Sequence, residues 1–158
     1  MSVEIIKANL QDMQLLYDMQ IESFRPLLEK YKDYEISPGN ETIEQIAKKY
    51  NQDFTTYWLI KRYDKTVGGV RIVNKGNGCY RVSPIFILPL EQGKGIAQET
   101  FRLLEKFYQD STKWELDTIL EEKGNCYLYE KLGYRKTGKI EIIKDGMTIV
   151  YYEKLIKL

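Results

Sequence analysis

Residues 85–100 read Ile-Phe-Ile-Leu-Pro-Leu-Glu-Gln-Gly-Lys-Gly-Ile-Ala-Gln-Glu-Thr. The stretch predicts a short apolar strand, a turn that contains two glycines, and a long amphipathic helix that begins directly after the turn. Glycine permits a tight turn and lets the backbone approach a ligand closely. The unpaired amides of the helix's first turn, at the positive end of the helix dipole, favour an anion. The residues alone therefore indicate a site for a phosphate or pyrophosphate.

Length and composition predict one globular domain over residues 1–158, because 43% of the residues are apolar and 30% are charged. The net charge of +1 provides no global field that would recruit nucleic acid or an anionic membrane. No apolar run reaches the ~18 residues of a membrane span, and the first residues lack a signal-peptide core. The sequence therefore predicts a cytoplasmic protein without nucleic-acid or membrane partners.

The chain contains no histidine, which excludes histidine-based triads, histidine metal sites and the commonest general base. Acid–base chemistry must come from Asp, Glu, Tyr, Lys, Cys or water. The two cysteines, Cys79 and Cys126, match no metal spacing and are too few for a disulfide framework. We expect free thiols and no metal site.

The first half of the sequence predicts a strand at 3–8 and a helix capped by Asn9. Pro26 should end or kink this helix near Arg25. A polar loop at 31–40 and a second helix that reaches Tyr50 follow.

The second half predicts strands at 55–63, 66–74, 79–88 and 113–120, with a helix after the glycine turn and another at 125–132. Asp145-Gly146 separates two final strands, 135–144 and 147–153, as a two-residue hairpin turn. Gly68-Gly69 indicates a bulge or a close backbone approach, and Pro84 either weakens the pairing of its strand locally or marks a bulge.

The predicted order is β-α-α-β-β-β-α-β-α-β-β. The fold class is mixed α/β (α+β), a mostly antiparallel central sheet of about seven strands flanked by about four helices. The strand–helix–strand crossover should place its two strands parallel.

Two motifs resemble the GNAT superfamily of acyl-CoA-dependent N-acetyltransferases. Residues 92–97 read Gln-Gly-Lys-Gly-Ile-Ala and fit the family's Gln/Arg-x-x-Gly-x-Gly/Ala signature after a strand. Residues 128–134 read Leu-Tyr-Glu-Lys-Leu-Gly-Tyr and are similar to the family's ending of the next helix. The resemblance covers the whole chain, because the order of elements also matches.

The resemblance implies that backbone amides of the turn hold the pyrophosphate of coenzyme A, while the pantetheine arm pairs with backbone at the strand end. Lys94 would add charge beside the phosphates or stand as a solvated turn residue. Asn125 would contact the cofactor or only cap a helix, since it lies four residues before Tyr129 where the family commonly has seven. The cofactor-binding residues so implied are Phe86, Ile87, Leu88, Gln92, Gly93, Lys94, Gly95, Ile96, Ala97, Gln98 and Asn125.

The same resemblance implies direct acetyl transfer from acetyl-CoA, with Tyr129 as the general acid for the departing thiolate. Tyr127 is the weaker rival. A backbone amide, that of Ile87 or its neighbour, would stabilise the oxyanion. Cys126 is a poorer candidate for an acylated nucleophile because it has no histidine partner.

The general base is expected to be Glu35 or Asp117, with Glu22 and Asp33 as further candidates. The acceptor, a small amine or an amino-acid-like molecule, should bind between the segment 24–50 and the C-terminal hairpin, where Tyr31, Tyr34 and Tyr50 line a cleft or cover the sheet. Alternatives are an acetyltransferase of protein or peptide amines and a non-catalytic acyl-CoA sensor. Family members are often dimers, and the edge strands offer places for such pairing.

Overall fold

The computed structural model describes residues 2–156, and its helices and strands follow the predicted order. They are β1 (Val3–Lys7), α1 (Met13–Tyr31), α2 (Ile43–Tyr50), β2 (Thr55–Arg62), β3 (Lys65–Gly76), β4 (Cys79–Ile87), α3 (Ile96–Phe107), β5 (Lys113–Ile119), α4 (Lys123–Lys131), β6 (Arg135–Lys144) and β7 (Met147–Leu155). Short 3-10 turns precede α1, α2 and α3.

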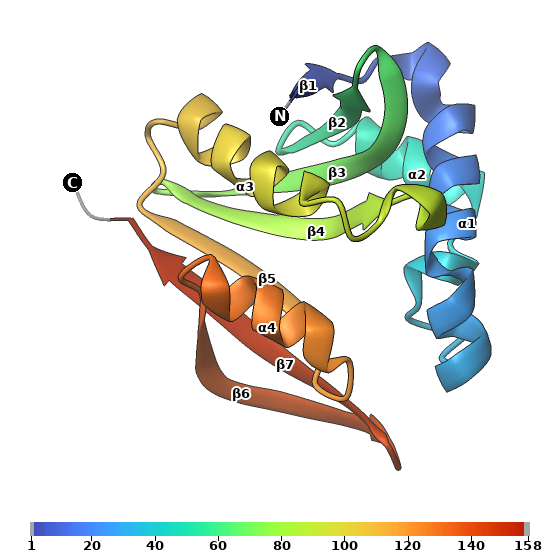
Figure 1. The fold of residues 1–158 in the computed structure, drawn as a ribbon, viewed down its shortest axis with the longest axis vertical. Coiled ribbons are helices and arrows are strands. Elements are labelled where there is room, and N and C mark those ends of the chain that lie inside the picture. The colour runs from blue at the N-terminus through green and yellow to red at the C-terminus, as the bar shows by residue number, and fades with distance from the viewer. Residues whose placement is uncertain (1, 157–158) are drawn as a thin grey trace.

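The strands form one 7-stranded sheet in the order β1-β2-β3-β4-β5-β7-β6 (Figure 1). Neighbouring strands are antiparallel except β4 and β5, which are parallel and joined through α3. The predicted fold class and the parallel crossover are confirmed. The edge strands are β1 and β6, so the C-terminal hairpin forms one border of the sheet.

The parallel pairing of β4 with β5 is short. Only Cys79 to Arg81 pair with Lys113 to Glu115, after which the two strands diverge into a wedge (Figure 1). Beyond this point the register between β3 and β4 shifts, because Val70 pairs with Ile85 whereas Ile72 pairs with Val82. The predicted bulge at Pro84 is confirmed, and it lies at the side of the wedge.

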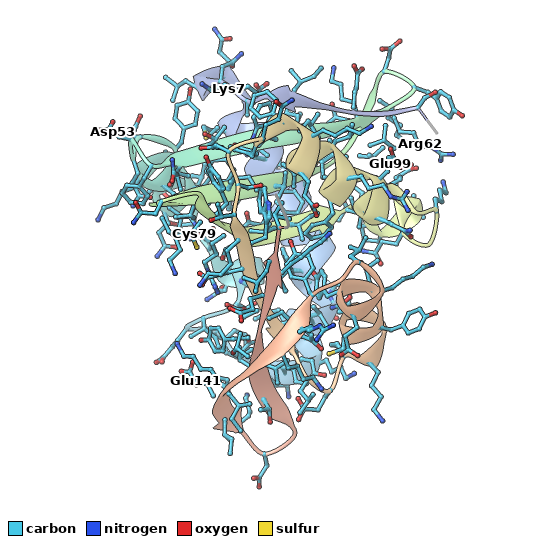
Figure 2. The ribbon with its side chains drawn as sticks, turned by 90° about the vertical axis from the view of Figure 1, so that its left-hand side faces the viewer. Lys7, Asp53, Arg62, Cys79, Glu99 and Glu141 are labelled. Carbon is cyan, nitrogen blue, oxygen red and sulfur yellow. The ribbon has the colours of Figure 1, made fainter. Side chains whose placement is uncertain are left out.

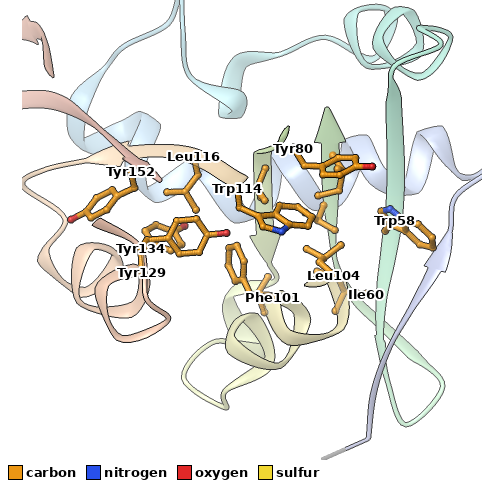
Figure 3. Packing of buried hydrophobic residues seen from close by; sticks show 14 of the residues in the cluster. Trp58, Ile60, Tyr80, Phe101, Leu104, Trp114, Leu116, Tyr129, Tyr134 and Tyr152 are labelled. Carbon is orange, nitrogen blue, oxygen red and sulfur yellow. The ribbon is translucent and has the colours of Figure 1, made fainter. Parts of the chain in front are cut away.

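Each face of the sheet carries its own apolar core. On one face, α3 and α4 cover a cluster that includes Trp58, Phe101, Trp114 and Tyr129 (Figure 3). On the other face, α1 and α2 cover a second cluster built around Leu16, Ile46, Tyr57, Leu59 and Phe86. Successive residues of a strand point to opposite faces, so Tyr57 and Trp58 belong to different cores.

The first helix begins as predicted but ends later. The side chain of Asn9 accepts a hydrogen bond from the amide of Gln11 at 3.0 Å, and a 3-10 turn then leads into α1. Pro26 does not end the helix, which continues to Tyr31. Contacts at the far end account for this, because Tyr31 is buried and its hydroxyl bonds Glu122 after β5. Tertiary packing thus overrides the local effect of proline.

The remaining local signals are also met. Asp145-Gly146 forms the turn between β6 and β7, with Gly146 at φ +80°. Cys79 and Cys126 are free, and Cys126 is buried. Within residues 2–156, the helices lack the combination of length and apolar character that crossing a membrane requires.

Gly68 and Gly69 mark both a bulge and a close approach. Between β2 and β3 the register shifts after the pair of Ile60 with Gly68. A Cβ atom built on Gly68 would collide with the carbonyl oxygen of Phe86, and one on Gly69 would lie 2.7 Å from the Phe86 ring. The two glycines therefore let β3 and β4 pack where the wedge opens.

We expect Gly68→Ala to lower the free energy of unfolding by about 1–3 kcal/mol, because the added methyl meets fixed backbone. Gly124→Ala is the matched control, since a Cβ at that α4 position meets nothing within 4 Å. Urea unfolding of both variants would measure the effect. Equal stability of the two would contradict the close-approach interpretation.

Candidate functional site

The wedge exposes backbone groups of β4. The amide of Leu88 donates to the carbonyl of Val67 at 2.8 Å. Hydrogen-bonded and non-hydrogen-bonded pairs alternate along an antiparallel ladder, so the amides of Ile85 and Ile87 point away from β3 and into the wedge. Residues 86–88 were all predicted to offer backbone contacts to a ligand. Of these three, only Ile87 points its amide into the wedge. Ile85 is a second such residue, which the sequence did not identify.

A half-buried arginine contacts the bulge in β4. Arg71 of β3 donates from Nη1 to the carbonyl oxygen of Ser83 at 2.9 Å. Burial lowers the pKa of this guanidinium, yet a group with an ordinary pKa above 12 stays charged. Sequence reasoning missed Arg71. The sequence does show a single charged residue within an apolar stretch of this strand. Its partner, Ser83, becomes known only once the register between β3 and β4 is known.

The glycine turn joins the wedge to the start of α3. Gly93 and Gly95 have φ values of +77° and +78°, in the left-handed region that glycine tolerates best. Gly95 is the N-cap of α3 and has no side chain with which to cap the first-turn amides, which stay available to an anion. The side chain of Gln92 donates to the carbonyl of Ile87 at 2.9 Å and fixes the turn against β4.

Lys94 is an exposed residue of the turn, with 43% of its side chain exposed. Its Nζ lies 3.1 Å from Glu91, and Lys65 lies 2.9 Å from the same carboxylate. These two lysines lower the pKa of Glu91. Lys94 is therefore a solvated turn residue that also forms an ion pair, and a role for its charge beside the phosphates stays a prediction.

Tyr129 lies on the inner side of α4, in the aromatic cluster of Figure 3. Its ring packs edge-on against Phe101 and Tyr134 at centroid distances of 5.8 and 6.2 Å. Burial, with a further contribution from the nearby charge of Asp117, raises the pKa of Tyr129. The phenol therefore keeps its proton at neutral pH. Tyr127, by contrast, is 71% exposed and points away from the core.

Of the two predicted bases, Asp117 lies at the wedge. It follows Glu115, the last β5 residue paired with β4, and forms an ion pair with Arg81 of β4. Its side chain is 35% exposed. Burial raises the pKa of Asp117 and so does Glu141, whereas Arg81 and Lys139 lower it, and the net direction is upward. Sequence reasoning missed Arg81, because the pair joins strands that α3 separates.

Glu35 lies in the exposed turn after α1, and within residues 2–156 its carboxylate makes neither an ion pair nor a side-chain hydrogen bond. The three tyrosines of the predicted acceptor region also differ in how exposed they are. Tyr31 is buried, Tyr34 is 56% exposed, and Tyr50 packs against the second core.

The start of α4 corrects one prediction. Helix α4 begins at Lys123 with Glu122 as its N-cap, so Asn125 occupies the third helical position and the capping role assigned to it is wrong. Glu122 instead joins α4 to α1. It accepts from the Tyr31 hydroxyl at 2.5 Å and from Lys30 at 2.8 Å. These two contacts hold the pKa of Glu122 below its ordinary value.

Comparison with known proteins agrees with this geometry. A family model described as Acetyltransferase (GNAT) domain matches residues 27–156. In sequence, the chain matches no curated protein. Among solved structures, a spermidine N-acetyltransferase from Vibrio cholerae in complex with CoA and spermine has a TM-score of 0.78 at 16% identity, covering 98% of this chain and 95% of that one.

Two further structures share the fold. The ribosomal-protein-S18-alanine N-acetyltransferase from Escherichia coli has a TM-score of 0.78 at 12% identity, with 99% of this chain and 95% of that chain covered. The paia N-acetyltransferase from Thermoplasma acidophilum, in complex with coenzyme A, also has a TM-score of 0.78, at 16% identity and 99% and 100% coverage.

The match of the family model over residues 27–156 places the chain in the class of acetyltransferases. The chain belongs to the GNAT acetyltransferase family, as its own sequence motifs predicted.

We expect Gly95→Glu to abolish coenzyme A binding in a calorimetric titration. The added side chain is bulky and strained at φ +78°, and its carboxylate would repel a pyrophosphate at the helix N-terminus. Gly146→Glu is the matched control, because Gly146 has φ +80° and lies in the hairpin turn, remote from α3. Undiminished binding by Gly95→Glu would contradict the pyrophosphate site.

Proposed function

We propose that residues 1–158 form a single N-acetyltransferase domain, which moves the acetyl group of acetyl-CoA directly to a primary amine of a small or amino-acid-like molecule. The observation that carries this proposal is the wedge. Two β4 amides face it, the start of α3 lies at its side, and Tyr129, which packs against Phe101 of α3, would supply the acid.

The chain's own groups suit coenzyme A. Amides of residues 93–98 would hold the pyrophosphate at the start of α3. The backbone of Ile87 would pair with the pantetheine arm as an added strand pairs with a sheet edge. Two structural relatives are described as complexes with CoA or coenzyme A, which supports this donor. Whether Asn125 reaches it stays a prediction, since Asn125 is exposed on α4.

Transfer forms one N–C bond and breaks one C–S bond. An amide of β4, from Ile85 or Ile87, would donate to the carbonyl oxygen as negative charge develops there. Tyr129 would give its proton to the departing sulfur, which leaves as a thiol. The amine's proton passes to a carboxylate or to water, so no enzyme nucleophile is needed.

Asp117 is the better candidate for the base. Its carboxylate stands at the narrow end of the wedge, and its raised pKa makes it a stronger proton acceptor than an exposed aspartate. Glu35 lies in an exposed turn. We therefore assign the base to Asp117 in this proposal.

Two structural relatives are named for protein substrates, the ribosomal-protein-S18-alanine enzyme and one that modifies the N-terminal serine of L7/L12. An assay of free thiol release with acetyl-CoA, across small amines and peptides, distinguishes these acceptor classes. Coenzyme A binding without turnover on any acceptor would instead identify a sensor. A homodimer stays a prediction, and a related spermidine N-acetyltransferase is described as dodecameric.

Tyr129→Phe should keep coenzyme A binding and lower turnover by about 10²–10⁴-fold, because the ring remains and the proton donor is lost. The control is Tyr127→Phe, at a side chain that is mostly exposed. Steady-state kinetics with thiol detection would measure both. Turnover that survives Tyr129→Phe would remove this residue from the role of acid.

Asp117→Asn should remove the acidic limb of the pH profile of kcat/KM. A base works only when deprotonated, and the pKa of Asp117 lies above the ordinary 3.8. Activity of the native enzyme should therefore fall as pH drops through that raised pKa. Glu35→Gln is the control and should retain the limb. The reverse outcome, in which Glu35→Gln loses the limb, would assign the base to Glu35.

A further inference from the structure

A hollow of about 440 Å³ lies beside the Arg81–Asp117 pair. Arg81, Glu115 and Tyr151 line it, together with Lys75 and Lys139. Glu115 and Tyr151 lie on β5 and β7, and Asp117 pairs with Tyr151 in the sheet. The hollow is therefore on the face opposite α3 and α4, between the narrow end of the wedge and the hairpin that carries Glu141, labelled in Figure 2.

The charges around the hollow are matched in number. Glu115 is held by Lys75 at 2.6 Å and by Lys113 at 3.2 Å. Lys113 also lies 3.9 Å from Glu153. Arg81 neutralises Asp117. Opposite charges in contact cancel most of their field at a distance, so these groups leave no excess of negative charge for a polycation.

Beside Tyr151, strand β6 adds one cation, Lys139, and one carboxylate, Glu141. Lys139 stacks over the Tyr151 ring with its Nζ 4.3 Å from the centroid. Glu141 accepts a hydrogen bond from the Tyr151 hydroxyl at 3.3 Å. The whole group contains four cations and four carboxylates: Lys75, Arg81, Lys113, Lys139, Glu115, Asp117, Glu141 and Glu153.

Arg81 has donors to spare. Its contact with Asp117 uses Nη2, whereas a guanidinium has five N–H donors in a planar fork that matches a carboxylate. In an α-amino acid the amine and the carboxylate are attached to the same carbon. One such molecule can therefore place its amine at Asp117 and its carboxylate on Arg81, two side chains that already touch.

We infer that the acceptor is a zwitterion, a free α-amino acid whose carboxylate is bound by Arg81 while its amine lies at Asp117. This inference rests on the proposed function. A polyamine would bring uncompensated positive charge to a neutral site, and a peptide N-terminus would leave Arg81 without its carboxylate. The hollow then receives the side chain of the amino acid.

The test compares free L-amino acids with their α-amides and with spermidine, in the native enzyme, by thiol release. The amide keeps the amine and the side chain and lacks only the negative charge. We expect kcat/KM to be about 10- to 100-fold higher for the acid than for its amide, the range of a charge-assisted hydrogen bond. Spermidine should be no better than the amide.

The variant Arg81→Gln should reduce the acid-to-amide ratio to near one. Loss of Arg81 also disturbs Asp117, but that effect acts on both acceptors and cancels in the ratio. Arg102→Gln is the matched control, since Arg102 pairs with Glu99 on α3, and it should leave the ratio unchanged.

The outcomes separate the two proposals. If amides or peptides exceed the free acids in the native enzyme, or if Arg81→Gln leaves the ratio intact, the zwitterion inference is overturned while the acetyltransferase proposal stands. If no amine releases thiol, the proposed function itself fails. The native-enzyme comparison requires no variant, so it decides the inference even if Arg81→Gln does not fold.

Discussion

The divergence of β4 from β5 is the constraint on which the rest of the structure depends. Parallel neighbours normally satisfy each other's backbone groups along their length, but here the pairing stops at Arg81 and Glu115. Ile85 and Ile87 consequently point their amides into open space rather than at a partner strand. Buried backbone groups need partners, and in the proposed function the pantetheine arm of coenzyme A would supply them. The rest of the fold secures this gap.

Three features secure it, two from β3 and one from the glycine turn. Arg71 fixes the bulge through the carbonyl of Ser83, and Gln92 fixes the glycine turn through the carbonyl of Ile87. Gly68 allows β3 to approach Phe86 where a larger residue would push the strands apart. All three act on β4 and none acts on β5. The shape of the wedge is therefore set by one strand, while the other strand contributes Asp117.

Local sequence signals predicted most of the fold, because its turns and helix ends are encoded locally. Asn9, Asp145-Gly146 and the glycines of residues 93–95 each have a conformational preference that acts within a few residues. Pro26 does not end the helix, because contacts of Tyr31, distant in sequence from its partner Glu122, stabilise the turn beyond it. Tertiary packing often outweighs a local preference of this kind.

The candidate site was less predictable, since its polar groups meet only through strand register. The chain holds 23 acidic residues, and nothing local distinguishes Asp117 from Glu35. Arg81 becomes informative only when β5 is placed beside β4. The capping role considered for Asn125 was wrong for a different reason, because Glu122 is the N-cap of α4 and lies three residues earlier.

The contact of Glu122 with Tyr31 and Lys30 affects how molecules can reach the gap between β4 and β5. The β4–β5 ladder closes the narrow end of the wedge, and this contact ties α1 to the start of α4 on the side where the strands have separated. Helix α3 lies on one face of the sheet beside this gap and α1 on the other. Under the proposed function, a donor bound on the α3 face and an acceptor bound on the α1 face would enter from opposite sides of the sheet, so both could be bound at the same time.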